Sequence, residues 1–319
     1  MRYLVSAAGL IEDPEEEQIQ SCVADQSGGV FWVHIEEPRE YDIDLLRRTF
    51  NFHALTIEEL RKRSRGQRIE DYPSYAFLVL QRPVWRGGQL FTEEVEVFLS
   101  RHYVVTVFMH SDPGLASLRK RLLAAPELAR EKPAFLQFLV LDQLVENSFS
   151  VLEALERAIN HLERQVITNP TRRQLGQAYD MRQTVTDLEK NLGGMEEVFQ
   201  HLITHSIDPQ DAQLLIYYRD IFGHIQRQHE SARELSDLAH SVMEVYMAGA
   251  DNRLNATMKQ LTMLAALFLP VTAISGFFGM NHQFLVEHIT SDVSFWLTLA
   301  LMVATQAVLA VFFWRRGYF

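Results

Sequence analysis

The sequence predicts an α+β/α membrane protein, in which an N-terminal α/β domain is followed by long helices and two C-terminal membrane spans. Strand-like runs rich in Val, Phe and Tyr lie within about the first 130 residues. Helical periodicity dominates after Pro133. Two apolar segments near the C-terminus have the length of about 20 residues that a hydrocarbon core of roughly 30 Å requires. The expected divisions are an α/β domain at 1–130, a helical stalk at 131–257, spans at 258–278 and 293–314, an outer loop at 279–292 and a basic tail at 315–319.

Within the α/β domain, β-branched and aromatic residues gather in four segments that are predicted to be strands: 31–35, 75–84, 91–99 and 103–109. The last two are close enough in sequence to form a hairpin. Residues 41–50 and 114–123 have helical periodicity. The acidic run 15–17 is predicted to be a surface turn. The basic run 61–65 is interpreted as a solvated helix end or a contact between subunits.

After residue 133 the sequence predicts two helices and then a much longer one. The first helix ends at Asn169–Pro170, which is a helix-ending signal. The second runs from 171 to about 205, with Gly193–Gly194 as a weak point. Asp208–Pro209 is typical of an N-cap followed by proline in the first helical turn.

No strong helix breaker follows until Pro270, which a membrane helix tolerates. A helix from 209 to 278 would be roughly 105 Å long at about 1.5 Å per residue. Its first half carries a coiled-coil-like stripe with a spacing of about 3.5 residues. The stripe consists of Leu215, Tyr218, Phe222, Ile225, Ala232, Leu235, Ala239, Val242 and Tyr246.

Charged and aromatic residues near the spans predict how the chain crosses the membrane. Lys and Arg are absent between Lys259 and Arg315, and Arg253 lies just before the first span. Because positive charge stays on the cytoplasmic side, both termini are expected in the cytoplasm and the loop outside. The protein is then a multi-pass protein of the inner membrane. Trp296 and Trp314 lie near the ends of the second span, where aromatic belts occur.

The composition argues against several classes of protein. A net charge of −11 over 319 residues argues against a nucleic-acid partner. The single cysteine, Cys22, excludes an internal disulfide and a Cys-rich zinc site. The sequence lacks a phosphate-binding loop and the common hydrolase motifs, so an enzyme is not expected. His201 and His205 have the spacing of a metal-binding pair, but no third ligand is evident, and a solvated helix face is the favoured interpretation.

Two spans per chain cannot enclose a water-filled path, so a channel would need several copies around an axis. One face of the first span mixes polar, small and apolar residues, and we call it the pore stripe. Its members are Asn255, Met258, Leu261 or Thr262, Ala265, Leu269, Thr272 and Gly276. Such a mixture suits hydrated and constricted levels of a pore, in which apolar rings gate by dewetting. The alternative is that the small residues let neighbouring helices approach closely.

Four segments carry a resemblance to a known family. Gly279–Met280–Asn281 directly follows the first span. Residues 217–224 (YYRDIFGH) lie in the stalk, and residues 254–262 (LNATMKQLT) and 268–272 (FLPVT) precede the tripeptide in register. Together they resemble the CorA family of divalent-cation channels over about the last hundred residues. The front half agrees with the family in layout only.

The resemblance implies a funnel-shaped homopentamer in the lipid bilayer, with a divalent cation as substrate and no permanently bound cofactor. It implies a selectivity filter at Gly279, Met280 and Asn281, where an amide oxygen hydrogen-bonds the water shell that Mg²⁺ keeps. Asp220 corresponds to an acid of a regulatory metal site between subunits. The family's pore-lining positions match Asn255, Met258, Leu261, Leu269, Thr272 and Asn281. Asn281 as a plain turn residue after Gly279 is the alternative.

Three departures from the family pattern leave the transported ion open. The acidic partner of Asp220 would fall at 85–88, where Arg86 stands and no acid occurs, so closing is expected to depend less on cytosolic Mg²⁺. Gln283 replaces an acid of the outer loop. His282 and His288 suit Zn²⁺, Co²⁺ or Ni²⁺ better than Mg²⁺, unless they are ordinary loop residues. The sequence therefore predicts a Mg²⁺ channel, with a zinc transporter of the same family as one alternative and a membrane-anchored scaffold or enzyme as another.

Overall fold

The computed structural model describes residues 1–6, 9–25, 30–62, 66–111, 113–124, 133–205, 212–280, 285 and 291–316. The chain divides into two compact units. The N-terminal unit contains Met1–Gln165 and Thr171–Met243, and the C-terminal unit contains Val166–Pro170 and Glu244–Phe319.

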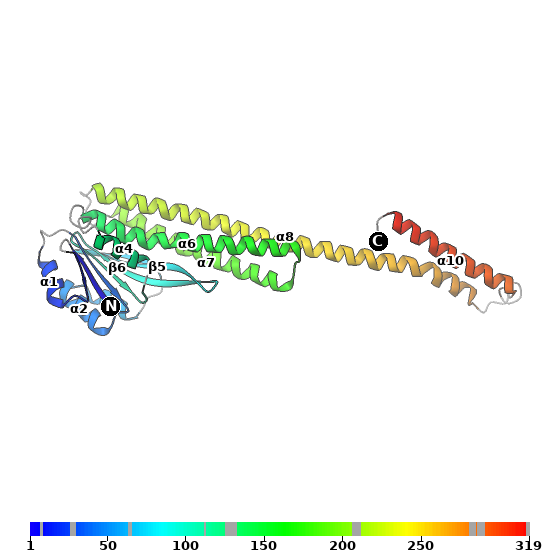
Figure 1. Cartoon of the computed structure of the whole chain (residues 1–319), viewed down its shortest axis with the longest axis horizontal. Coiled ribbons are helices and arrows are strands. Elements are labelled where there is room, and N and C mark those ends of the chain that lie inside the picture. Colours follow the sequence, from blue (N-terminus) through cyan, green and yellow to red (C-terminus); the bar gives the residue numbers. More distant parts are fainter. Residues whose placement is uncertain are drawn as a thin grey trace. The chain divides into compact units, whose positions relative to one another are not determined.

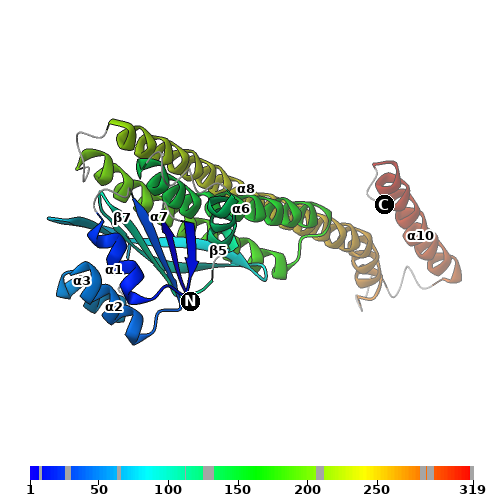
Figure 2. The ribbon, with the colours of Figure 1, turned by 60° about the vertical axis from the view of Figure 1, so that its left-hand side comes forward.

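A seven-stranded mixed sheet forms the base of the N-terminal unit, in the order β2-β1-β3-β7-β6-β5-β4. Its strands are β1 (Arg2–Ser6), β2 (Gly9–Glu12), β3 (Phe31–Glu36), β4 (Arg68–Tyr72), β5 (Tyr75–Arg86), β6 (Gln89–Leu99) and β7 (Tyr103–Phe108). The central strands β3 and β7 are parallel, and all other neighbours are antiparallel. Both faces are covered by helices (Figures 1 and 2), so the central strands are buried along their whole length.

Alternate residues of the strands feed two separate cores, because successive side chains point to opposite faces of a sheet. Val33 packs with α1 (Glu16–Ala24), α2 (Glu40–Phe50) and α3 (Ala54–Lys62). Trp32 belongs to the core under α4 (Pro113–Ala124) and the three long helices described below. The sheet is thus the middle layer of three.

All four predicted strands are confirmed, including the β6–β7 hairpin. The prediction of a surface turn at 15–17 is wrong, because Glu16 and Glu17 form the first turn of α1. The amide N–H of Glu15 donates to Oε1 of Gln18 at 2.9 Å and completes a capping box. Acidic side chains are favourable there because the amino end of a helix carries partial positive charge. The basic run does begin at a helix end, since Arg61 and Lys62 close α3.

The first two long helices are α6 (Pro133–Thr168) and α7 (Arg172–Thr204), and they end where the sequence predicts. α7 continues through the predicted weak point without a break. A Cβ on Gly194 would lie 3.0 Å from Nε2 of Gln67, whose amide donates to the Asn191 carbonyl at 2.5 Å. Gly194 therefore makes room for the side chain of Gln67, the residue before β4. It does not kink α7.

The third long helix, α8 (Ala212–Phe278), has 67 residues and continues through Pro270. Asp208 and Pro209 lie outside the described residues. Within the N-terminal unit α8 lies beside α6 and α7 (Figures 1 and 2). Its buried residues are Leu214, Tyr218, Ile221, Ile225, Gln228, Ala232, Leu235, Ala239 and Val242, six of which belong to the predicted stripe. The stripe packs inside the chain: Tyr218 donates to Oε1 of Gln137 at 3.1 Å, and Gln228 donates to the Val145 carbonyl at 3.2 Å.

Two helices in the described part of the chain are long and apolar enough to cross a membrane. They are α8, through its second half, and α10 (Asp292–Arg315). Ser291 caps α10, and its hydroxyl accepts from the Ser294 amide at 3.4 Å. α8 ends at Phe278, and α10 begins at Asp292 and ends at Arg315.

Candidate functional site

One face of α8 in the C-terminal unit lies against α10. The half-buried residues on this face are Met263, Ala266, Leu267, Pro270, Val271 and Ile274. They recur at steps of three, four or one residue, which keeps them on one side of a helix with about 3.6 residues per turn. The side-chain amide of Gln306 on α10 donates to the Leu267 carbonyl in the middle of this face. We call these residues the α10-facing row.

The predicted pore stripe lies on the opposite side of α8. All its members are exposed in the single chain, and Met258, Leu261 and Leu269 are 54%, 60% and 72% exposed. At about 100° per residue, the stripe centres roughly half a turn from the α10-facing row. The described part of the chain therefore leaves the stripe uncovered.

The stripe carries polar and apolar levels in alternation along the helix. The Thr272 hydroxyl donates to the Phe268 carbonyl at 2.9 Å, so its oxygen keeps a lone pair directed away from the helix backbone. Leu269 lies about one turn below Thr272, and Ala265 about one turn below Leu269. In a bundle of copies these levels would form a polar ring, an apolar constriction and a wider ring.

A glutamine lies within the apolar helix α10, and its partner is in the helical turn before Pro270. Proline has no amide hydrogen, so it leaves the Ala266 carbonyl, four residues earlier, without its helical donor, and its ring crowds the carbonyls of this turn. Gln306 donates to the neighbouring Leu267 carbonyl. The amide thus joins the two helices in the turn that the proline disturbs.

We expect Gln306→Leu to lower the free energy of unfolding of the membrane region by about 1 kcal/mol, the usual size of a hydrogen bond between membrane helices. Thr305→Val is the matched control, because the Thr305 hydroxyl donates to the Leu301 carbonyl of its own helix, at 2.8 Å. Thermal unfolding of both purified variants in detergent checks this. Equal losses in the two variants would contradict a role for the bond between the helices.

The α8 helix ends at the first two residues of the predicted filter. The amide of Gly279 donates to the Ser275 carbonyl at 2.9 Å, and that of Met280 to the Phe277 carbonyl at 3.3 Å. A Cβ on Gly279 would lie 2.9 Å from the same Ser275 oxygen, a distance that real Cβ atoms do not adopt. Glycine is therefore required for this tight end of the span.

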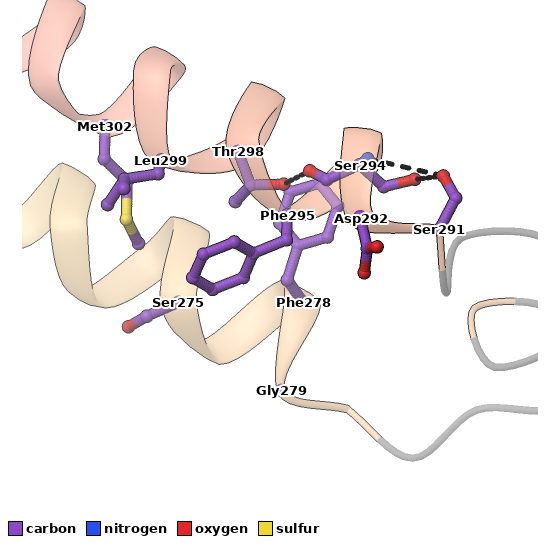
Figure 3. Close-up of a pocket in the computed structure, with 10 residues that line it drawn as sticks. All are labelled: Ser275, Phe278, Gly279, Ser291, Asp292, Ser294, Phe295, Thr298, Leu299 and Met302. Atoms are coloured by element: carbon purple, nitrogen blue, oxygen red, sulfur yellow. Dashed lines mark hydrogen bonds between the residues drawn. The ribbon is translucent and has the colours of Figure 1, made fainter.

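Other predicted residues of the outer mouth, namely Asn281, His282, Gln283 and His288, lie outside the described residues. Beside Gly279 a pocket of about 550 Å³ opens between the ends of α8 and α10. Figure 3 shows the hydroxyls of Ser291, Ser294 and Thr298 in sequence along the start of α10. Thr298 donates to the Ser294 carbonyl at 2.8 Å, and the Ser291 and Ser294 oxygens are 2.7 Å apart. The Ser291 and Ser294 hydroxyls thus bond to each other, and the Thr298 hydroxyl bonds to the helix backbone.

Asp220 lies on the part of α8 that belongs to the N-terminal unit, and its side chain is 56% exposed. Nε2 of His224 lies 3.8 Å from its carboxylate, and Nδ1 of the same ring lies 3.2 Å from Oδ1 of Asp142 on α6. The pKa of Asp142 is raised above its ordinary value, chiefly because the carboxyl group is half-buried. The nearby His224 partly offsets this rise, whereas the neighbouring carboxylates of Glu146 and Asp220 add to it. A second acid therefore approaches Asp220 from its own chain, which the sequence did not reveal.

Among the residues that the structure describes, none of the groups of His, Cys, Asp and Glu has three members placed to hold a metal. Arg86, which stands where the family's second acid is expected, pairs with Oε1 of Glu93 at 2.8 Å. His201 is not simply solvated, because its Nε2 lies 2.7 Å from Oδ2 of Asp71 on β4 and its ring stacks on His205. His201 thus joins α7 to the edge strand β4.

Comparison with known proteins settles the family. The family model described as "CorA-like Mg2+ transporter protein" matches residues 27–316. The chain belongs to the CorA family. It is 27% identical over 289 residues to a putative metal ion transporter, YfjQ, from Bacillus subtilis, covering 91% of this chain and 90% of that protein. It is 23% identical over 291 residues to the cobalt/magnesium transport protein CorA of Thermotoga maritima, covering 90% and 83%.

The fold is also that of the CorA family. The structure of the CorA magnesium transporter from Methanocaldococcus jannaschii superposes with a TM-score of 0.83, covering 100% of this chain and 99% of that one at 16% identity. The family and fold are those of membrane transporters of divalent metal ions, not of enzymes. The chain is accordingly a membrane protein, and the apolar second half of α8 and the helix α10 are its candidate membrane spans in the described residues.

Proposed function

We propose that this CorA-family chain is one subunit of a homopentameric channel that admits Mg²⁺ passively across the inner membrane. The uncovered pore stripe of α8 carries the proposal. Its opposite side is occupied by α10, and a face that mixes Asn255 and Thr272 with leucines is poorly suited to lipid. Packed around an axis, five such faces would form a path with polar and apolar rings.

The driving force for this uptake is the membrane potential. A doubly charged ion gains about 4.6 kcal/mol in crossing 100 mV, since each charge contributes about 2.3 kcal/mol. We place both termini in the cytoplasm on the distribution of Lys and Arg. The divalent cation is the substrate, and Asp220 with an acid from the same or a neighbouring subunit is a candidate regulatory site.

Flux through proteoliposomes tests the proposal against its alternatives. Purified protein should take up Mg²⁺ without any nucleotide when an inside-negative potential is imposed, and the uptake should collapse with the potential. An anchored scaffold or enzyme would give no flux of any divalent ion. Competition by Zn²⁺, Co²⁺ and Ni²⁺ in the same vesicles ranks the ions.

Histidines of the outer loop favour the second candidate, a zinc transporter, because imidazole binds Zn²⁺ and Co²⁺ better than Mg²⁺. We expect His282→Ala/His288→Ala to reduce Zn²⁺ flux while Mg²⁺ flux is retained, because the filter amide does not depend on them. Gln283→Ala, between the two, is the control for loop perturbation. Unchanged Zn²⁺ flux in the double variant would show that the histidines are ordinary loop residues.

A further inference from the structure

The turn between α6 and α7 is fastened to α8 just before the membrane. Nη1 of Arg253 donates to the Pro170 carbonyl at 2.7 Å, and Nη2 donates to Oδ1 of Asn169 at 2.5 Å. A guanidinium presents its donors in a rigid planar fork, so both bonds form from one orientation of the side chain. Arg253 thus spans the two residues at the tip of the turn.

A second contact lies one helical turn earlier on the same face of α8. A Cβ on Gly249 would lie 3.1 Å from Cγ and 3.8 Å from Cβ of Pro170. The first distance is tighter than side chains normally tolerate, so the glycine lets the proline ring sit directly on the helix backbone. Gly249 and Arg253 are four residues apart and therefore hold the turn from one side.

The grouping of the chain into compact units agrees with this attachment. Val166–Pro170, which includes the last three residues of α6, belongs to the C-terminal unit with Glu244–Phe319. The end of α6 and the two residues after it are therefore part of the same compact unit as the second half of α8.

The attachment lies on the side of α8 that also faces α10. Continued in steps of three and four residues, the line through Gly249 and Arg253 reaches Met263, Leu267 and Ile274 of the α10-facing row. The turn and α10 thus hold one side of the helix at successive heights. The pore stripe is on the other side, so a rotation of α8 at Arg253 would turn the stripe with it.

We propose that the turn 166–170 is a clamp on α8, in which Arg253 and Gly249 fix the rotation of the pore stripe and carry movements of the α6–α7 hairpin into it. This inference rests on the proposed channel function. Arg253 is then a positioning residue, and its effect on flux depends on the planar guanidinium group that donates to both Asn169 and Pro170. The competing explanation is a positive charge at the cytoplasmic membrane surface, for which any cation serves.

Two single variants separate the fork from the charge. Arg253→Lys keeps the charge and loses the two-point contact, and Asn169→Ala removes one acceptor without altering any charge. We expect each to lower Mg²⁺ flux in proteoliposomes about tenfold, a shift of roughly 1.4 kcal/mol. Asn252→Ala, a neighbouring exposed amide, should leave it unchanged. Wild-type flux in both Arg253→Lys and Asn169→Ala would overturn the clamp.

A covalent replacement of the clamp gives the decisive test. The Cβ separation of 3.8 Å between Gly249 and Pro170 suits a disulfide, so we combine Gly249→Cys, Pro170→Cys and Arg253→Lys with Cys22→Ser. Oxidation should form the disulfide, which mass spectrometry of peptides detects, and should raise Mg²⁺ flux about tenfold. Reduction should break the disulfide and lower the flux again. A bond that forms without restoring flux, or a bond that does not form, overturns the inference. Absence of flux in the wild type would instead overturn the channel function. Formation of the disulfide is detected separately from flux, so the two failures can be told apart.

Discussion

Asn281→Ala is expected to reduce divalent flux by at least about tenfold while the oligomer stays intact. The side-chain amide is the polar group proposed to meet the hydrated ion at the outer mouth. A hydrogen bond to a charged partner contributes about 1.5–3 kcal/mol, and about 1.4 kcal/mol corresponds to a factor of ten. Initial rates of Mg²⁺ uptake into proteoliposomes give the comparison.

Two controls interpret that result. Size-exclusion chromatography with light scattering checks that the oligomer forms, because Asn281 lies beyond the end of α8 and should not support its packing. Asn281→Gln keeps the amide but displaces it by one methylene, and should retain more flux than alanine. Uptake of Asn281→Ala at the wild-type rate would show that the tripeptide is not the entrance filter.

Leu269→Asn is expected to raise resting flux by at least about tenfold. Leu269 is 72% exposed in the single chain and lies on the pore stripe. A ring of leucines at this level would exclude water from a narrow pore, and amides in their place would keep it wet. The measurement is the rate of Mg²⁺ leak into proteoliposomes without an imposed potential, compared with that of the wild type.

Leu264→Asn is the matched control for Leu269. Leu264 is likewise apolar and 52% exposed, but it projects from α8 roughly 140° away from Leu269 at about 100° per residue. It should therefore leave the leak unchanged. An equal leak in both variants would indicate general damage to the membrane region, and no leak in either would place the resting barrier elsewhere.

Residues with strong periodicity made most of the fold predictable. The β5–β6–β7 strands follow from β-branched and aromatic runs, and the end of α6 and the start of α7 follow from Asn169–Pro170. The edge strands β2 and β4 were missed because each is only four or five residues long and half-exposed, and β1, which lies next to β2, was missed because it has only five residues. Edge strands of this kind carry little alternation that a single sequence can reveal.

Contacts between residues that are far apart in the sequence could not be predicted. The sequence analysis did not single out Gln306, although a polar residue in a span is the signal that finds such sites, and its partner at Leu267 depends on the packing of α10. Asp142 lies beside His224 in the structure but 82 residues before it in the sequence. Arg253 was interpreted from its charge alone, whereas the structure assigns it two acceptors on the α6–α7 turn.

The central claim is that the pore stripe lines a path for divalent cations, and block of flux in single-cysteine variants tests it most directly. On a Cys22→Ser background, cysteines replace Met258, Leu261, Ala265, Leu269, Thr272 and Gly276 on the stripe, and Met263, Leu267 and Ile274 on the α10-facing row. A positively charged, water-soluble thiol reagent should block Mg²⁺ flux at the stripe positions and leave the row positions unaffected. Block confined to the row positions, or block at none of the nine, would contradict the claim.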